Sequence, residues 1–227
     1  MIEIVPAILP KSFSDLEMKL ATIQGTTSRV QIDTVDGVFA PNITWPYTEG
    51  TRFERILAEE EGMPFWEDFD FEFDAMVINP KEEIPKYLKA GATRVVLHGA
   101  GGEIMSALEA LQAGRAGDFG VEVGIALLPG DSSGTFAQYK SLVDFVQVMG
   151  IAEVGVQGSA FDERALELVA ALRADNPSLT IQVDGGVNLE NAKQIANAGA
   201  NKLVVGSAIF AATNPLEALE ALEDEVN

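Results

Sequence analysis

Two similar stretches decide the fold of this chain: Gly91-Ala-Thr-Arg-Val-Val-Leu-His-Gly-Ala100 and Gly199-Ala-Asn-Lys-Leu-Val-Val-Gly-Ser-Ala208. Four of their ten positions are identical, and the second stretch lies 108 residues after the first, which is four units of 27. Self-similarity at a fixed offset indicates a repeated architecture. An offset of four strand–helix units fits a barrel built from two halves.

Working outward from these stretches, short β-rich runs alternate with helical runs eight times. The predicted strands span residues 2–8, 29–33, 69–77, 94–98, 121–127, 145–149, 180–183 and 202–205. Amphipathic segments lie between them, with apolar residues recurring three and four positions apart, at residues 16–23, 81–90, 103–113, 163–174, 189–198 and 215–222. Alternating strands and helices with short connections predict right-handed βαβ units and a parallel sheet.

An open, doubly wound sheet is the alternative to a closed barrel. Eight units match the barrel count, and the half-length repeat favours closure. No linker or low-complexity stretch interrupts the chain, and the acidic residues 217–225 keep leucines at helical spacing, so they predict a final helix with a solvated face. We therefore expect a single α/β domain over residues 1–227, a (β/α)8 or TIM barrel.

The composition restricts the partners of this protein. A net charge of −20 disfavours nucleic acid and anionic membrane surfaces. The absence of cysteine excludes disulfides and thiolate metal sites. No apolar run approaches the length of a membrane span, and the opening Met-Ile-Glu-Ile-Val-Pro lacks the features of a signal peptide. We expect a cytoplasmic protein, and a homo-oligomer because the apolar exterior of such barrels often supports association.

Polar residues at strand ends are the candidates for chemistry, because the loops after the strands form the reaction face of a barrel. Gln31 and Asp33 lie two apart on one predicted strand and therefore point the same way. Asp74 lies inside an apolar run, and Asp184 directly precedes two glycines. A cap or turn role would serve for any one aspartate alone. Acids at three strand ends together favour a functional site.

Glycines at the ends of the seventh and eighth strands predict a phosphate site. Gly185 and Gly186 precede a helix that we expect to open at Asn188, and Gly206 and Ser207 open a short segment before the last helix. Glycine permits close approach of the backbone, and N–H groups at a helix start can hold an anion. Turn glycines without a ligand are the alternative interpretation.

At these residues the chain resembles the ribulose-phosphate 3-epimerase family, over nearly its whole length. Residues 6–9, Pro-Ala-Ile-Leu, resemble the family's Pro-Ser-Ile-Leu. Residues 30–42 resemble its His-Val-Asp-Val-Met-Asp-Gly-His-Phe-Val-Pro-Asn signature, and residues 73–80 resemble its Val-His-Leu-Met-Ile-Glu-Asn-Pro strand. Val-Asp-Gly-Gly-Val at 183–187 and Gly-Ser-Ala-Ile-Phe at 206–210 match the motifs at the family's phosphate end.

The resemblance implies an isomerase of carbohydrate metabolism, of the pentose phosphate type, that inverts C3 of a small ketose phosphate. In the family two aspartates carry the proton chemistry, and they correspond to Asp33 and Asp184. The family also binds a divalent metal through two histidines and the same two aspartates. Here Gln31 and Asp74 stand where the histidines would be.

This exchange leaves two alternatives for the metal. The ligand set Gln31, Asp33, Asp74 and Asp184 is all oxygen, which suits Mg²⁺ or Mn²⁺ rather than zinc or iron. Otherwise the metal has been lost, and Asp74 is protonated or paired, because carboxylates in one cavity repel one another.

Four residues are expected to contact the substrate: Gln31, His98, Met149 and Gln157. Met149 and Gln157 keep places similar to those of the family in the loop after the sixth strand, although its Pro-Gly-Phe-Gly-Gly-Gln segment is absent. His98 is the only histidine of the chain and matches a position where the family also tends to have one. A role as a neutral core or rim histidine is the alternative for His98.

Three functions remain open on the sequence. The first is the epimerase. The second is a sugar-phosphate-binding barrel that has lost the metal and the epimerase activity. The third is a lyase of the related decarboxylase and hexulose-phosphate synthase group, whose chemistry relies on a lysine among aspartates. Residues 71–78 of the third strand contain no lysine.

Overall fold

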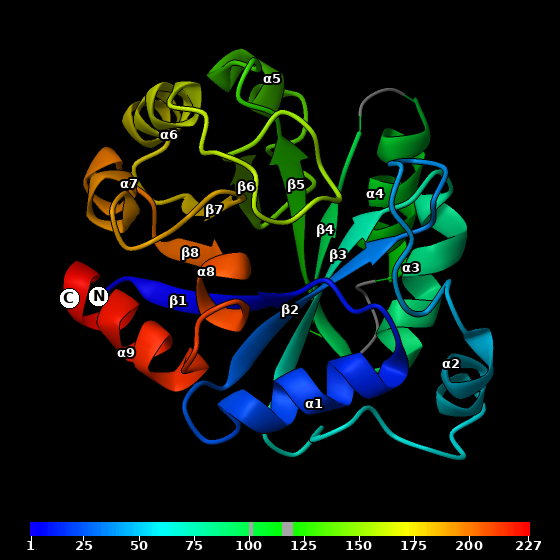
Figure 1. Ribbon diagram of the computed structural model, residues 1–227. Helices are drawn as coiled ribbons and strands as arrows, with labels where there is room; N and C mark the ends of the chain where they lie inside the picture. The colour runs from blue at the N-terminus through cyan, green and yellow to red at the C-terminus, as the bar shows by residue number, and fades with distance from the viewer. Residues whose placement is uncertain (100–101, 115–119) are drawn as a thin grey trace. The chain divides into compact units, whose positions relative to one another are not determined.

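A computed structural model describes residues 1–99, 102–114 and 120–227. Its eight strands follow one another in chain order in a closed ring, and every strand pair with a resolved register is parallel (Figure 1). The strands are β1 Glu3–Ile8, β2 Arg29–Val35, β3 Asp70–Met76, β4 Ala92–Leu97, β5 Glu122–Leu127, β6 Phe145–Met149, β7 Thr180–Asp184 and β8 Lys202–Val205. This is a (β/α)8 barrel, as predicted. Ala100, the last residue of the repeated motif, lies outside the described residues.

Helices alternate with these strands. They are α1 Phe13–Ile23, α2 Gly50–Leu57, α3 Pro80–Lys89, α4 Gly102–Gly114, α5 Ser133–Ala137, α6 Arg164–Asp175, α7 Ala192–Ala198, α8 Ser207–Phe210 and α9 Pro215–Val226. The six helices predicted from apolar spacing are confirmed. Helices α2, α5 and α8 were not predicted, because segments of eight, five and four residues are too short to show a helical period. No described helix has both the length and the apolar character needed to cross a membrane.

The chain forms two compact units. The terminal unit comprises Met1–Ala7 and Gly124–Asn227, and the central unit comprises Ile8–Val123. The strand order of the barrel runs through both. The expectation that residues 1–227 form one domain stays a prediction.

In the central unit, the third strand shows how alternation sorts polar from apolar side chains. Glu72 and Asp74 alternate with Phe71, Phe73 and Ala75, and all five are buried. Neighbouring side chains in a strand point to opposite faces. Phe73 packs outward on Tyr87 of α3, with ring centroids 4.9 Å apart and nearly parallel planes. Asp74 therefore points to the other side, into the barrel interior.

The loop after β2 is tied to the end of β3 by one carboxylate. Asp36 accepts hydrogen bonds through Oδ1 from the backbone N–H groups of Val38 and Phe39, at 2.8 and 2.7 Å. Its Oδ2 accepts from the N–H of Ile78, at 2.8 Å. Gly37 allows the turn because its φ is +78°. The Asp-Gly pair of the family signature thus fixes the loop that carries Phe39.

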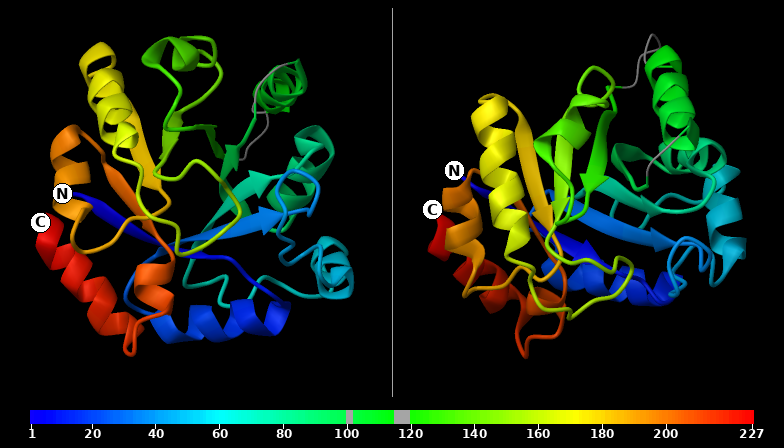
Figure 2. Two further views of the ribbon diagram at one scale, coloured as in Figure 1. Left: turned by 45° about the horizontal axis from the view of Figure 1, so that its top comes forward. Right: turned by 90° about the horizontal axis from the view of Figure 1, so that it is seen from above.

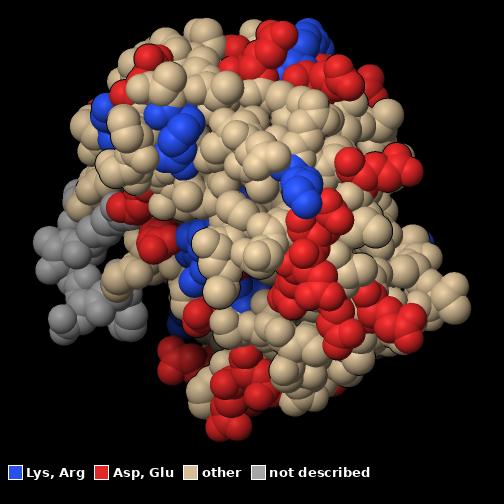
Figure 3. Space-filling view, turned by 90° about the vertical axis from the view of Figure 1, so that its left-hand side faces the viewer, with Lys and Arg blue, Asp and Glu red and all other residues tan. Residues whose placement is uncertain are grey.

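In the terminal unit the two chain ends lie side by side (Figure 2). The side chain of Asn227 accepts a hydrogen bond from the N–H of Ile2 at 2.8 Å and donates one to its carbonyl at 3.1 Å. Helix α9 buries Leu219 and Leu222 and exposes acidic residues, as the sequence predicted for a final helix with a solvated face. Figure 3 shows a large group of acidic side chains on one part of this face, with smaller groups of basic side chains beside and above it.

Candidate functional site

The central unit holds a buried amide–carboxylate pair on β2. Gln31 is fully buried and Asp33 is 7% exposed. The amide nitrogen of Gln31 donates to Oδ1 of Asp33 at 2.8 Å. The two side chains therefore point the same way, as their spacing predicted. A buried carboxylate needs hydrogen-bond donors, and Gln31 supplies one.

His98 and Asp74 form a second buried pair in this unit. Nε2 of His98 lies 2.6 Å from Oδ1 of Asp74, and the two residues are 3% and 0% exposed. His98 follows directly after β4, which ends at Leu97, so the predicted strand was one residue too long at this end. The ring of Phe39 meets the imidazole edge-on, with centroids 6.0 Å apart. His98 was predicted as a substrate residue, and its bond to Asp74 was not foreseen.

These two pairs stand next to each other. Asp33 on β2 is in register with Asp74 on β3, and the two carboxylates offer oxygens within 4.8 Å of each other. Like charges at this separation in the protein interior disfavour double ionisation unless donors or a cation compensate. Gln31 and His98 supply one donor to each carboxylate. These two donors therefore allow the carboxylates of Asp33 and Asp74 to lie next to each other in the protein interior.

In the terminal unit, Asp184 ends β7 as predicted and is half-buried. The amide nitrogen of Gln147 on β6 lies 3.3 Å from Oδ2 of Asp184 and 3.4 Å from Sδ of Met149. Gln182 in turn donates to the amide oxygen of Gln147 at 2.6 Å. Met149 is in register with Asp184 on the neighbouring strand. The structure thus brings Met149 and Asp184 together, as members of one small polar network.

Gln147 and Gln182 were not predicted from the sequence. Both are fully buried, and both interrupt apolar strands. The signal that could have found them is spacing: Gln147 lies two residues before Met149, and Gln182 two residues before Asp184, so each shares a face with a predicted site residue.

The glycine turn after β7 needs glycine for its backbone. Gly185 and Gly186 have φ angles of +99° and +69°, which favour glycine. A Cβ atom on Gly186 would lie 2.8 Å from the Cα of Phe161. The carbonyl of Gly186 accepts hydrogen bonds from the side-chain amides of Asn188 and Asn191, at 3.1 and 3.0 Å. These asparagines fix the turn.

The helix expected to open at Asn188 begins later, at Ala192. Oδ1 of Asn188 accepts from the backbone N–H groups of Glu190 and Asn191, at 2.9 and 3.3 Å. An asparagine that binds the backbone two residues on forms a turn in place of a helical start. The expectation for Asn188 was therefore wrong by one helical turn.

The second glycine position, Gly206, lies against Gln157. Ser207 is the first residue of α8, and Gly206 precedes it. A Cβ on Gly206 would stand 2.6 Å from the amide nitrogen of Gln157 and 3.2 Å from the carbonyl oxygen of Ala7. Gln157 also donates to that carbonyl, at 3.4 Å. The structure therefore brings Gln157 to the Gly206–Ser207 turn, where its amide would have to move to admit a larger residue than glycine.

Asp33 on β2 and Asp74 on β3 form a pair of carboxylates in the central unit that could share a metal ion, and Asp184 at the end of β7 is the third acid that the sequence predicted. Their donor set fits a hard divalent cation such as Mg²⁺ or Mn²⁺, which prefers oxygen ligands. Gln31 directs its amide nitrogen to Asp33, so it would join this set only through its carbonyl oxygen.

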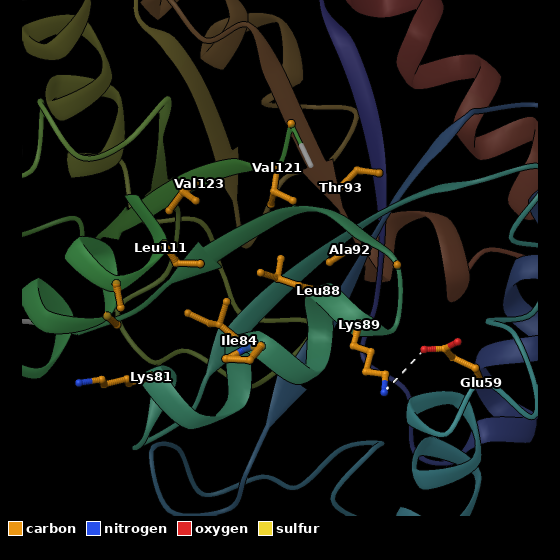
Figure 4. A pocket seen from close by; sticks show the side chains of 15 residues that line it. Glu59, Lys81, Ile84, Leu88, Lys89, Ala92, Thr93, Leu111, Val121 and Val123 are labelled. Atoms are coloured by element: carbon orange, nitrogen blue, oxygen red, sulfur yellow. Dashed lines mark ion pairs between the residues drawn. The ribbon is translucent and has the colours of Figure 1, made fainter. Parts of the chain in front are cut away.

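A large pocket of the central unit lies elsewhere. It measures about 880 Å³ and is lined mainly by apolar residues of α3 and α4 and of the first residues of β4 and β5 (Figure 4). An ion pair of 3.7 Å between Lys89 and Glu59 stands at its side. His98 and the aspartates stand near the other, carboxyl ends of the strands. This pocket therefore has no part in the acidic site.

Residues 3–210, most of the chain, match the model of the Ribulose-phosphate 3 epimerase family. The chain belongs to this family. The relationship suggested by the sequence motifs is therefore confirmed, and with it membership in a family whose name describes epimerases of ribulose phosphate.

Individual relatives agree with this membership. The chain is 29% identical to a ribulose-phosphate 3-epimerase of Schizosaccharomyces pombe, covering 99% of this chain and 93% of that one. It is 30% identical to a ribulose-phosphate 3-epimerase of Aquifex aeolicus, with coverage of 85% and 82%. A crystal structure of 3-hexulose-6-phosphate synthase from Salmonella typhimurium superposes with a TM-score of 0.70 at 16% identity, over 99% and 98% of the two chains. This last likeness shows the fold alone.

Proposed function

We propose that this protein is an epimerase that inverts C3 of a ketose phosphate, with D-ribulose 5-phosphate as the first candidate substrate. The observation that carries the proposal is the adjacent buried pair of Asp33 and Asp74 in a member of the epimerase family, a chain that also keeps Asp184 at the end of β7. Acids at the carboxyl ends of barrel strands are suited to proton transfer next to a carbonyl group.

Asp33 and Asp184 take the two proton-transfer roles in this proposal. β2 and β7 are three steps apart in the ring of eight, so their side chains can meet a ligand from opposite sides. One carboxylate removes the proton from C3, and the electron pair moves to give an enediolate with the C2 oxygen. The other carboxylic acid returns a proton to C3 from the opposite face. The sum is inversion without a change in oxidation state.

The phosphate group would bind at the two glycine turns. Gly185 and Gly186 at the end of β7, and Gly206 and Ser207 at the end of β8, present backbone without bulky side chains. Backbone N–H groups at such turns hold phosphate in many barrels of this type. We assign Gln157, Met149 and His98 to contacts around the substrate. The position of Gln157 against Gly206 supports its assignment.

A divalent cation, Mg²⁺ or Mn²⁺, would bind to Asp33, Asp74 and Asp184, with Gln31 as a further ligand once its amide turns. When bound, it would offset the negative charge that develops on the enediolate oxygens. The chain's own residues orient the acids: Gln31 holds Asp33, His98 holds Asp74, and Gln147 holds Asp184.

Exchange of the C3 proton with solvent tests the proposal directly. D-ribulose 5-phosphate is incubated with the protein in D₂O and followed by ¹H NMR, in parallel samples with Mg²⁺, Mn²⁺ and EDTA. We expect loss of the C3 proton signal and appearance of the C3 epimer. If no sample shows label at C3 and no epimer forms, the proposed function is wrong.

A second function, binding of a sugar phosphate without epimerisation, is favoured by one specific observation. Gln31 and His98 already donate to Asp33 and Asp74, so these two acids have partners that need no cation. This candidate predicts that D-ribulose 5-phosphate raises the melting temperature while C3 does not exchange. The absence of a thermal shift at millimolar ligand would reject it. Homo-oligomerisation and a cytoplasmic location stay predictions.

A further inference from the structure

We propose that His98 is the positioning residue of Asp74: by holding Oδ1 of that carboxylate, it sets the orientation in which Asp74 ligates a divalent cation. The inference rests on the proposed function in taking Asp74 as part of the site. It goes beyond that function because it gives the imidazole the role of orienting a metal ligand.

The geometry of the pair carries the first step. Nε2 and Oδ1 are 2.6 Å apart, a distance typical of a short hydrogen bond between a ring N–H and a carboxylate. Both residues are buried, at 3% and 0% exposure, so water does not compete for the bond. A carboxylate held at one oxygen cannot rotate freely about its side-chain torsions. His98 therefore fixes which way Asp74 faces.

The strand register explains how an imidazole after β4 reaches a carboxylate in the middle of β3. Asp74 is paired with Val96, and His98 stands two residues beyond Val96, on the same side of the strand. The imidazole thus lies one side-chain layer nearer the carboxyl ends of the strands and reaches back to Asp74. It stands behind or beside the carboxylate, where it can orient this ligand without replacing it.

The surroundings hold the imidazole in place. The ring of Phe39 meets it edge-on, at 6.0 Å between centroids. Phe39 belongs to the loop that Asp36 fixes through the backbone N–H groups of Val38, Phe39 and Ile78. The loop after β2, the end of β3 and the residue after β4 therefore combine to set one ring orientation.

The electrostatic reason for this arrangement is the neighbouring acid. Asp33 and Asp74 offer oxygens within 4.8 Å of each other, and Gln31 already holds Asp33. Without the imidazole, repulsion between the two carboxylates would turn Asp74 away from Asp33. With His98 in place, each carboxylate keeps its position. Metal ligands in proteins are commonly oriented by such hydrogen bonds, whose loss weakens metal binding by about 10–100-fold.

Binding of Mn²⁺ alone tests the proposal, with free Mn²⁺ read by electron paramagnetic resonance during titration of the full chain. His98→Phe keeps a flat ring and removes the donor, and we expect it to weaken Mn²⁺ binding about 10–100-fold. His98→Gln supplies an amide N–H and should recover most of the affinity. In an Asp74→Asn background, His98→Phe should cause little further loss, because the charged ligand that His98 orients is already gone.

Tyr87→Phe is the matched control. Tyr87 is a fully buried residue of the same unit, and its hydroxyl lies 2.6 Å from that of Tyr47. It stacks on Phe73, which points to the opposite face of β3 from Asp74. Burial raises the pKa of Tyr87 above its ordinary value, so the hydroxyl stays protonated during the titration. The variant deletes a part-buried hydrogen bond to Tyr47 and leaves the side chains of His98 and Asp74 unchanged, so Mn²⁺ affinity should stay at the wild-type value.

Three outcomes overturn the inference: equal Mn²⁺ affinity of wild type and His98→Phe, an equal loss in Tyr87→Phe, or no Mn²⁺ binding by the wild type. If His98→Phe does not fold, His98→Met replaces it as the variant without a donor. The proton-exchange experiment is read separately. Exchange at C3 without a His98-dependent Mn²⁺ site leaves the epimerase and rejects the inference, whereas a His98-dependent site without exchange does the reverse.

Discussion

The central and terminal units each support a site aspartate, Asp33 and Asp184, with a buried glutamine, but the next layer of side chains differs between them. In both, a buried glutamine donates an amide hydrogen to the aspartate, Gln31 at 2.8 Å and Gln147 at 3.3 Å. The layers beneath differ. In the central unit Gln31 is in register with Glu72, which forms a buried ion pair with Arg94. In the terminal unit the corresponding layer contains a neutral pair, Gln147 with Gln182.

This difference shows that the chain concentrates the buried charges of its candidate site in the central unit. The central unit places Glu72, Asp33 and Asp74 on neighbouring positions of two strands, and Arg94 forms an ion pair with Glu72. The terminal unit contributes one of the predicted site aspartates, Asp184, and positions the predicted phosphate turn through glycine backbone held by Asn188 and Asn191. The central unit therefore builds its part of the site from buried charges, and the terminal unit builds its part mainly from glycine turns.

The largest expected effect comes from removing either acid at the centre of the comparison. Asp33→Asn and Asp184→Asn keep the shape of the side chain but cannot accept a proton. If each carboxylate serves one face of C3, each variant should lower kcat by about 10²–10⁴-fold, the usual contribution of a general base. The rate of C3 exchange and the rate of epimer formation are measured for both.

Unequal losses would change the comparison. A large loss in Asp33→Asn with an unaffected Asp184→Asn would mean that the terminal half only binds the substrate. Circular dichroism melting provides the control, since both variants should keep the wild-type fold. Loss of neither activity would reject two-aspartate transfer altogether.

The next effect tests the charged layer. Arg94→Met leaves Glu72 as a buried charge that has lost its guanidinium, and the side chains of the pair are only 3% and 0% exposed. Removing one partner of a buried ion pair typically costs about 3–5 kcal/mol. We expect a loss of that size in the free energy of unfolding, measured with urea.

The double variant Arg94→Met with Glu72→Gln is the matched control, because it removes both charges. Its stability should recover most of the loss. A single variant as stable as the wild type would show that the charged layer contributes no more than a neutral one. Arg94 also forms an ion pair with the more exposed Glu122, which the double variant removes equally.

The barrel could be predicted because its sequence signals are local and periodic. Strand alternation places Gln31 with Asp33, and the motif at 183–187 places Asp184 before two glycines with positive φ. These features depend only on side-chain spacing and on the backbone freedom of glycine. The acids and the glycine turns could therefore be located before the structure was known.

The contacts between strands could not be predicted in the same way. The bond from His98 to Asp74 depends on the register of β3 against β4, and the bond from Gln147 to Asp184 on that of β6 against β7. One residue of slip would place either partner on the wrong face. The late start of α7 has a different cause, because Asn188 can either begin a helix or bind the backbone as a turn.

Gly186→Ala tests the half that relies on backbone. The φ of +69° and a distance of 2.8 Å from a new Cβ to the Cα of Phe161 both oppose a side chain here. Left-handed backbone strain costs about 1–3 kcal/mol. We expect a lower melting temperature and a smaller thermal shift with D-ribulose 5-phosphate. Gly50→Ala is the control, because a Cβ there has nothing within 4 Å.

The Gly186→Ala experiment is interpreted from the melting temperature and the ligand-induced thermal shift together. A lower melting temperature with an unchanged ligand shift would make Gly186 a turn glycine without a phosphate role. Only a loss of shift confined to Gly186→Ala supports the glycine turn as the phosphate site.

The smallest effect compares the two glutamines directly. Gln31→Leu and Gln147→Leu each delete an amide hydrogen bond to an aspartate, and a bond to a charged group is worth about 1.5–3 kcal/mol in net stability. The bond of Gln31 is shorter, at 2.8 Å against 3.3 Å, so its loss should reduce kcat more while both variants keep the wild-type KM. Steady-state kinetics with D-ribulose 5-phosphate measures the difference. If Gln147→Leu proved the more damaging, the neutral network with Gln182 would position its aspartate more firmly than the charged half positions Asp33.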